Sequence, residues 1–376
     1  METVARIMRE LSETIGPRFS ASDGEHQAAD LLAREFKSAG LEVEMQRLGF
    51  IGWESKSKPE VVLTAPEQRV LASAPVVYSA SADGLEGRVV KHGTRILIAG
   101  LYEMPTFAVL DDNDAPVGYL VVNKGGDAIP LINPEGLYRR VQLVISDADG
   151  AEIDKLLDSD VEVRVRMTFE SELDPDAYSY NVIARYVGNP DSDEHIVVCA
   201  HYDTQIESPG AYDNASGTAG MFGVLEHIKS RGLATNVTFI GIAGEEVGMF
   251  GSHYLVNDLV ERGKLEDVKY CVCLDQISGG DFFWLWCTDT ELRRKALDAI
   301  DASGARDMAE LKIDDNKPGA DHWAFHERGV PACLLMWWRQ AEYHRSTDTF
   351  EKADFERVKV AVDSASTLVE TLAKEL

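Results

Sequence analysis

Five side chains that could bind metal ions lie in the second half of the chain, most of them where an apolar run gives way to a polar loop. This set of imidazoles and carboxylates consists of His201, Asp213, Glu246, Asp275 and His344. Two imidazoles and three carboxylates favour zinc or a similar first-row ion, whereas calcium and magnesium prefer shells made only of oxygen. Cobalt and manganese also suit such a shell. The residue types therefore predict a hydrolytic site that holds two metal ions.

The first of the five stands at the end of an apolar run. Residues 196–200 predict a strand that is buried on both faces and ends at His201. Residues two apart on a strand share a face, so Asp203 can lie beside His201. A carboxylate there would accept the second imidazole N–H and fix the tautomer that binds metal. Alone, a His-x-Asp pair is more often a surface turn, so this interpretation depends on the other four residues.

Asp213 lies in a turn of small residues, 210–217, just before a helical pattern at about residues 218–230. An Asp before a helix is most often its N-cap. Capping does not explain why small residues surround this Asp on both sides. A carboxylate that bridges two cations must be approached closely from two directions, and small neighbours permit that approach. The turn therefore favours a bridging ligand.

Another apolar run, 237–242, leads to the adjacent pair Glu245 and Glu246. Two neighbouring side chains at a strand end diverge, so the two carboxylates are expected to differ in role. One can bind a metal while the other stays unligated and takes a proton from the attacking water. A Glu pair is also common in solvated loops, and only its neighbours favour the catalytic interpretation.

Two further runs lead to the remaining candidates. Residues 270–274 end at Asp275, and residues 331–336 continue through two tryptophans toward Tyr343 and His344. Strands that alternate with helical patterns predict an α/β fold, here a mainly parallel mixed sheet flanked by helices. In open α/β sheets, ligands gather at the carboxyl ends of the strands. We therefore expect the candidates to meet at one edge of the sheet.

The order and spacing of these residues resemble the co-catalytic zinc peptidases, a family that includes bacterial aminopeptidases and glutamate carboxypeptidase. The resemblance covers roughly residues 1–50 and 178–376 and extends to the stretches 15–18, 181–185 and 319–322. It departs from the family pattern at Ala320, where a serine is more usual. Because position 320 is not a ligand position, this departure concerns substrate detail rather than metal binding.

The resemblance implies a role for each site residue. It implies two zinc ions bridged by Asp213, with one site completed by His201 and Asp275 and the other by Glu246 and His344. It further implies Glu245 as general base, Asp203 as the partner of a metal-binding imidazole, and Tyr343 as a hydrogen-bond donor to the developing oxyanion.

The length of 376 residues suggests one large domain plus a smaller one. Helical patterns occur near residues 2–14, 24–39 and 358–372, and a strand is expected at 41–45. Residues 1–57 and 176–376 are assigned to a discontinuous catalytic domain. Residues 58–175 are assigned to an inserted β-rich domain that resembles the protease-associated domain in pattern rather than in signature residues. A structural layer with no separate role is an equal alternative for this insert.

Short apolar runs in the insert predict its strands, at 88–90, 95–99, 117–122 and 161–165. None of them leads to a cluster of candidate ligands.

Five cysteines, an odd number, all fall in apolar runs, which favours buried free thiols in a reducing cytoplasm. The first twenty residues lack the apolar core of a secretory signal, and no run reaches membrane-spanning length. We expect a cytoplasmic protein without a membrane partner.

The formal net charge of -27 makes nucleic acid an improbable partner and would attract a free α-ammonium group. The expected substrate is a peptide, cleaved at its amino terminus by an aminopeptidase. Five tryptophans around the later ligand segments could line an apolar pocket, although packing in the core is the more common role of large aromatics; they are Trp284, Trp286, Trp323, Trp337 and Trp338. Arg339 and Arg345 leave open a carboxypeptidase or an N-acyl amino acid amidohydrolase. A non-catalytic binding module is a remoter alternative, and assembly into a homo-oligomer stays open.

Overall fold

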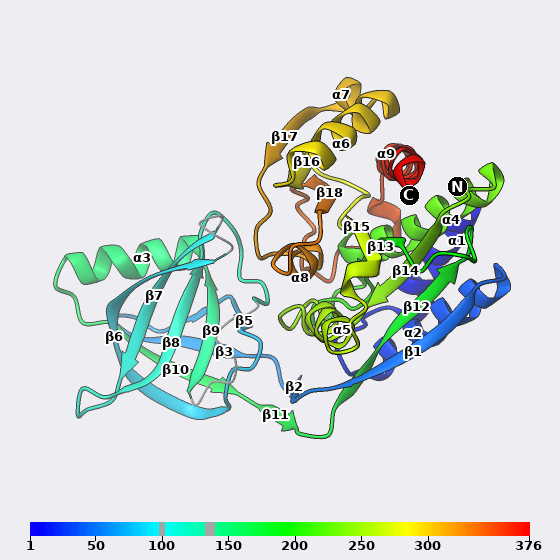
Figure 1. Ribbon diagram of the computed structural model, residues 1–376. Helices are drawn as coiled ribbons and strands as arrows, with labels where there is room; N and C mark the ends of the chain where they lie inside the picture. Colours follow the sequence, from blue (N-terminus) through cyan, green and yellow to red (C-terminus); the bar gives the residue numbers. More distant parts are fainter. Residues whose placement is uncertain (98–101, 132–139) are drawn as a thin grey trace. The chain divides into compact units, whose positions relative to one another are not determined.

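The computed structural model describes residues 1–97, 102–131 and 140–376. The chain divides into two compact units, one made of Met1–Gly49 and Tyr178–Leu376 and the other of Phe50–Ala177 (Figure 1). The boundaries differ from those expected at 57/58 and 175/176. The reason is that β2 (Gly52–Ser55) pairs with β11 (Ser171–Asp174), so both short strands belong to the second unit.

The first unit is built on an eight-stranded mixed sheet. Its strand order is β1 (Glu42–Gly49), β12 (Tyr178–Tyr186), β14 (Asn236–Ile242), β13 (His195–His201), β15 (Val268–Leu274), β18 (Ala332–Trp338), β16 (Phe282–Cys287) and β17 (Glu310–Asp314). The four central strands, β14, β13, β15 and β18, run parallel. The strands β12 and β16 run antiparallel to their central neighbours, and β1 runs antiparallel to β12. The central strands are almost entirely buried, as their unbroken apolar runs predict.

Helices cover both faces of this sheet, which confirms the predicted fold class. They are α1 (Glu2–Arg9), α2 (Asp23–Ser38), α4 (Ser216–Arg231), α5 (Phe250–Glu261), α6 (Thr290–Ser303), α7 (Ala305–Met308), α8 (His322–His326) and α9 (Phe355–Leu372). In Figure 1, α4 and α9 lie on one side of the sheet and α5 and α8 on the other. A π-helical segment, Glu10–Ile15, continues α1 to the end of the helix expected at 2–14. Among the described residues, no helix combines the length and apolarity of a membrane span.

The described residues of the second unit form mainly strands, together with the helix α3 (Asp147–Asp158). Its main sheet has the order β4 (Arg69–Leu71), β3 (Glu60–Ala65), β10 (Arg164–Phe169), β6 (Ala82–Leu97), β7 (Tyr102–Leu110), β8 (Pro116–Asn123), β9 (Val141–Ser146) and β5 (Ser73–Pro75). The runs 88–90 and 117–122 lie in β6 and β8. The strand expected at 161–165 starts three residues later, at Arg164, and of the run 95–99 residues 98 and 99 lie outside the described residues.

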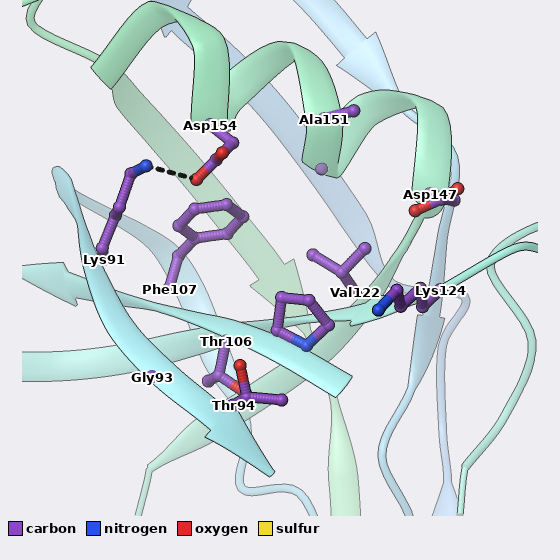
Figure 2. Close-up of a pocket in the computed structure, with 12 residues that line it drawn as sticks. Lys91, Gly93, Thr94, Thr106, Phe107, Val122, Lys124, Asp147, Ala151 and Asp154 are labelled. Carbon is purple, nitrogen blue, oxygen red and sulfur yellow. Dashed lines mark ion pairs between the residues drawn. The ribbon is translucent and has the colours of Figure 1, made fainter. Parts of the chain in front are cut away.

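A pocket of about 340 Å³ lies in the second unit, between α3 and the strands β6, β7 and β8 (Figure 2). Phe107 and Val122 form part of its apolar lining, and two lysines stand at its edge. Lys91 Nζ lies 2.7 Å from a carboxylate oxygen of Asp154. Lys124 Nζ lies 2.9 Å from Glu103. Both lysines are therefore already paired within the unit.

Candidate metal centre

The first unit brings the five predicted ligands together at the carboxyl edge of its parallel strands. His201 is the last residue of β13, and Asp275 directly follows β15. The other three lie in the loops after β14 and β18 and in the turn before α4; they are Glu246, His344 and Asp213. All five side chains are buried. The edge of the sheet is therefore where the sequence predicted these side chains to meet.

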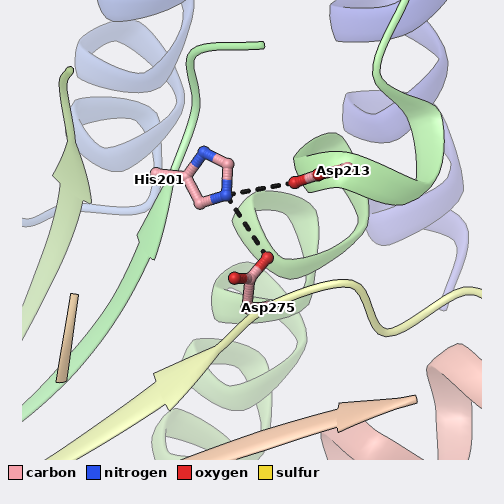
Figure 3. Close-up of side chains that lie close together, drawn as sticks. All are labelled: His201, Asp213 and Asp275. Atoms are coloured by element: carbon pink, nitrogen blue, oxygen red, sulfur yellow. Dashed lines mark hydrogen bonds and ion pairs between the residues drawn. The ribbon is translucent and has the colours of Figure 1, made fainter. Parts of the chain in front are cut away.

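The five side chains form two groups that share one carboxylate, Asp213. His201 Nε2 lies 3.2 Å from Asp213 Oδ1 and 3.3 Å from Asp275 Oδ1 (Figure 3). His344 Nε2 lies 3.3 Å from Asp213 Oδ2 and 3.3 Å from Glu246 Oε2. Within each group the potential ligand atoms all lie within 4.8 Å of one another. Since the two oxygens of Asp213 face different imidazoles, this carboxylate has the placement of a bridge.

The carboxylates around the two imidazoles stabilise positive charge on their rings. Burial alone would lower the pKa of His344, but Glu246 and Asp213 outweigh it and raise the pKa to about 10. Burial is likewise outweighed at His201, whose pKa is raised well above its ordinary value by Asp275 and other carboxylates. Protons on both imidazoles thus neutralise part of the buried negative charge. Metal ions would take over this task and release those protons, because a ligating imidazole must be neutral.

The donor set fits a pair of divalent cations. Buried carboxyl groups cluster in and around the site, namely Glu25, Asp203, Asp213, Glu245, Glu246, Asp275, Asp321 and Asp348. Among the described residues, Glu246 Oε1 is buried without a hydrogen bond, and Asp213 Oδ1, which also forms none, lies 3.2 Å from the imidazole of His201. Burying charged or polar atoms without partners is costly. Two dications would remove that cost for both oxygens.

The backbone around Asp213 is packed too closely for larger residues. Asp213 is not the N-cap of α4, which begins after Ala215 without a side-chain cap. A Cβ atom at position 217 would lie 2.4 Å from the carbonyl oxygen of Leu274 and from Asn214 Oδ1. The backbone N–H groups of Tyr212 and Asp213 donate to the carboxylate of Asp348, at 2.8 and 3.1 Å. The close packing of small residues and the hydrogen bonds to Asp348 therefore fix the position of Asp213 near the end of β15.

Asp203 links His201 to the loop that carries the glutamate pair. Its Oδ1 accepts from the backbone N–H of Glu245 at 3.2 Å, and its Oδ2 accepts from that of Glu246 at 3.1 Å. Ser20 Oγ donates to Oδ2 at 2.7 Å. His201 Nδ1 lies 3.2 Å from the Asp203 carbonyl oxygen and 3.4 Å from Oδ1, so the backbone of Asp203 is the nearer partner.

The structure places Glu245 beside the metal-binding groups but in neither of them. Burial raises the pKa of Glu245 well above its ordinary value; His201 opposes this shift, and Glu246 adds to it. The ring of Tyr343 stacks on the imidazole of His344, with centroids 3.7 Å apart, and meets Trp338 edge-on at 5.3 Å. The roles of Glu245 as base and Tyr343 as oxyanion donor stay predictions.

Sequence reasoning missed two amides that bind the candidate ligands. Gln276 Nε2 donates to Asp213 Oδ2 at 3.1 Å, and Gln205 Nε2 donates to Glu246 Oε2 at 3.2 Å. Both side chains are buried. A search for ligand types passes over neutral amides, although Gln276 directly follows a candidate ligand at a strand end, and that position was a usable signal.

The tryptophans divide between core and partly exposed positions. Trp284, Trp286 and Trp337 are buried, as the packing alternative expects. Trp323 and Trp338 are partly exposed. Trp338 also contacts Trp284, with ring centroids 6.2 Å apart. Of the five, Trp338 is the one whose ring the structure places against Tyr343.

Known proteins are similar to this chain in sequence and in fold. Residues 181–369 match the family model described as peptidase family M28. The chain is 25% identical over 397 residues to aminopeptidase YwaD of Bacillus subtilis, covering 97% of this chain and 84% of the relative. Its fold is similar to that of an aminopeptidase from Aneurinibacillus sp. strain AM-1 (20% identity, 98% and 92% of the two chains, TM-score 0.75).

It is also similar in fold to a peptidase M28 precursor from Shewanella amazonensis (19% identity, 99% and 93% of the two chains, TM-score 0.77). Both structural similarities extend over nearly the full length of this chain, the second unit included. The family match covers half of the chain and contains all five predicted ligands. The chain belongs to peptidase family M28 and is a metallopeptidase.

Proposed function

We propose that this metallopeptidase is an aminopeptidase that uses two zinc ions to hydrolyse the bond after the first residue of a peptide. The observation that carries this proposal is the pair of ligand groups that share Asp213. A relative from Bacillus subtilis is called an aminopeptidase, which supports the proposal. Zinc is the metal we propose, and cobalt or manganese would suit the same donors.

The chain's own residues supply most of the chemistry. Two zinc ions, when bound, would polarise the scissile carbonyl and lower the pKa of the attacking water. Glu245 accepts the proton of that water and later donates it to the leaving amine. Asp203 holds the backbone of the loop on which Glu245 lies. Tyr343, beside His344, donates a hydrogen bond to the developing oxyanion.

The charges at the site favour a substrate ammonium group over a carboxylate. The buried groups there are mainly acids, and Arg18 is the buried cation among them. Its guanidinium donates to the backbone carbonyls of Tyr202, Leu11, Gly16, Pro209 and Gly210. Arg18 is therefore committed to the fold. A carboxypeptidase or N-acyl amino acid amidohydrolase would need another cation, and the candidates named from the sequence are the exposed Arg339 and the partly buried Arg345, which follows His344.

The choice between these activities is tested with matched substrates. Unblocked aminoacyl amides should be cleaved, and their N-acetylated forms should be slower by several orders of magnitude, since burying an ammonium-binding carboxylate without its partner is costly. Peptides that are amidated at the carboxyl end should be cleaved as fast as the same peptides with a free carboxyl group. Equal or faster cleavage of the acetylated forms would contradict the aminopeptidase assignment and favour an amidohydrolase or a carboxypeptidase.

A further inference from the structure

Gln205 and Gln276 are two buried amides that the proposed mechanism does not use. They donate to carboxylates of one ligand group, the His344 group, which consists of Asp213, Glu246 and His344. Gln276 Nε2 donates to Asp213 Oδ2, and Gln205 Nε2 donates to Glu246 Oε2. These are the two oxygens that lie 3.3 Å from His344 Nε2. Each ligand oxygen that faces His344 therefore also accepts a hydrogen bond from an amide.

The other ligand group lacks such donors. In this His201 group, the oxygens that face His201 Nε2 are Oδ1 of Asp213 and Oδ1 of Asp275. Within residues 1–97, 102–131 and 140–376, no side-chain amide donates to either oxygen. The two groups share the carboxylate of Asp213, but they differ in how their ligand oxygens are held.

Gln276 is fixed by several contacts beside the shared carboxylate. Its backbone N–H donates to Asn214 Oδ1 at 3.1 Å, and its carbonyl accepts from the N–H of Trp337 at 3.1 Å. Its Oε1 accepts from the Tyr212 hydroxyl at 3.2 Å. The backbone has a left-handed conformation (φ 52°), which is uncommon outside glycine and persists where surrounding contacts fix it. Because Oε1 faces Tyr212, the N–H side of the amide faces Asp213.

Gln205 binds Glu246 although one atom of its amide has no partner. Its Nε2 lies 3.2 Å from Glu246 Oε2 and 3.3 Å from the Glu246 carbonyl oxygen. Within the described part of the chain, Gln205 Oε1 is buried without a hydrogen bond. A buried polar atom without a partner is costly, so packing alone would favour an apolar side chain here. The contribution of position 205 is therefore the amide N–H.

Resting on the proposed function, we propose that Gln205 and Gln276 are positioning residues for the zinc ion of the His344 group. An ionised carboxylate oxygen offers about two lone-pair sites, so the amide takes one and leaves one for a cation. A neutral amide orients the carboxylate without cancelling its charge, whereas a lysine or arginine would compete with the metal ion. Loss of a partner that orients a metal ligand lowers metal affinity by about 10- to 100-fold.

Zinc affinity in two single-site backgrounds tests the proposal. Asp275→Ala confines zinc to the His344 group, and Glu246→Ala confines it to the His201 group. In the Asp275→Ala background, adding Gln205→Met or Gln276→Met should raise the Kd for zinc at least about tenfold. In the Glu246→Ala background, the same two changes should alter the Kd by less than about threefold, because neither amide contacts an oxygen that faces His201. Competition with a coloured chelator measures each Kd without reference to peptidase activity.

The matched control is Asn316→Leu, at another buried amide of the first unit. Asn316 Nδ2 donates to the carbonyl of Ala332 at the amino end of β18, away from the ligands, and Asn316 Oδ1 is unpaired like Gln205 Oε1. This variant should keep the Kd of both backgrounds. If a methionine variant does not fold, asparagine replaces it with the same expectation, because its amide is one methylene shorter.

The outcomes separate the positioning role from the proposed function. An unchanged Kd in the Asp275→Ala background would overturn the positioning role, as would equal weakening in both backgrounds. The expected pattern in a protein that does not cleave aminoacyl amides would support the positioning role and overturn only the aminopeptidase assignment. If the parent binds a single zinc ion at saturation, the two-metal site falls and the positioning role falls with it.

Discussion

At the scale of single residues, Asp213 joins the two metal-binding groups, because each of its oxygens faces a different imidazole. The sequence predicted its partners from residue type and from position at strand ends. It did not identify Gln205 and Gln276, because an amide carries no charge or metal preference that would single it out, and only Gln276 had a signal in its position directly after Asp275. Such contacts arise from the fold.

Changing each of the adjacent glutamates, Glu245 and Glu246, to glutamine should have different effects on turnover and on metal binding. Glu245→Gln should keep both metal ions and lose at least about a hundredfold in kcat, the usual contribution of a positioned general base. Glu246→Gln should lower metal occupancy at one site. Elemental analysis together with steady-state kinetics measures both effects. The opposite behaviour of the two variants would reverse their assignment.

Trp338 offers a test of substrate preference. Its partly exposed ring lies edge-on to Tyr343. If this ring contacts the first side chain of the substrate, Trp338→Ala should lower kcat/KM for leucine amide by at least about tenfold and for alanine amide by less, as expected for lost apolar contact. The control is Trp323→Ala, at a partly exposed tryptophan whose ring lies tilted against that of His326. Equal losses on both substrates would remove Trp338 from the specificity pocket.

At the scale of helices and strands, the unbroken apolar runs made the central strands predictable, and the turn before α4 made the close packing at Asp213 predictable. The pairing of β2 with β11 was not predictable, since strands of four residues carry little sequence pattern and are defined by their partners. The same reason explains why the expected boundaries of the insert differ from those of the structure.

Position 217, in the first turn of α4, should not tolerate a residue larger than glycine. In Gly217→Ala the new Cβ would meet backbone at the end of β15, so we expect a loss of about 1 to 3 kcal/mol in the free energy of unfolding, as overpacking causes. Zinc affinity should fall as well, because Asp213 lies four residues earlier. The control is Gly220→Ala on the same helix, where the nearest atom is the flexible end of Ile277 at 2.8 Å. Urea unfolding that ranks the two variants equally would contradict this packing argument.

At the scale of the whole molecule, the chain consists of a catalytic unit and a β-rich second unit. The ends of the second unit meet where Gly49 pairs with Tyr178, so a short linker could replace residues 50–177. All predicted ligands lie outside this segment. The variant that lacks residues 50–177 should bind two zinc ions and hydrolyse aminoacyl amides. Its selection of peptide length or its assembly state should change. Unchanged length selection and assembly would show the second unit to be structural only.

The most direct test of the two-metal site is to measure zinc binding and activity together in the full-length protein after chelation. We predict that chelators abolish peptidase activity, that zinc or cobalt restores it, and that full activity returns only when two ions are bound per chain. Carboxylate and imidazole ligands release their metals reversibly, so the restoration should be complete. Full activity with one ion or none bound per chain at saturation would contradict the account.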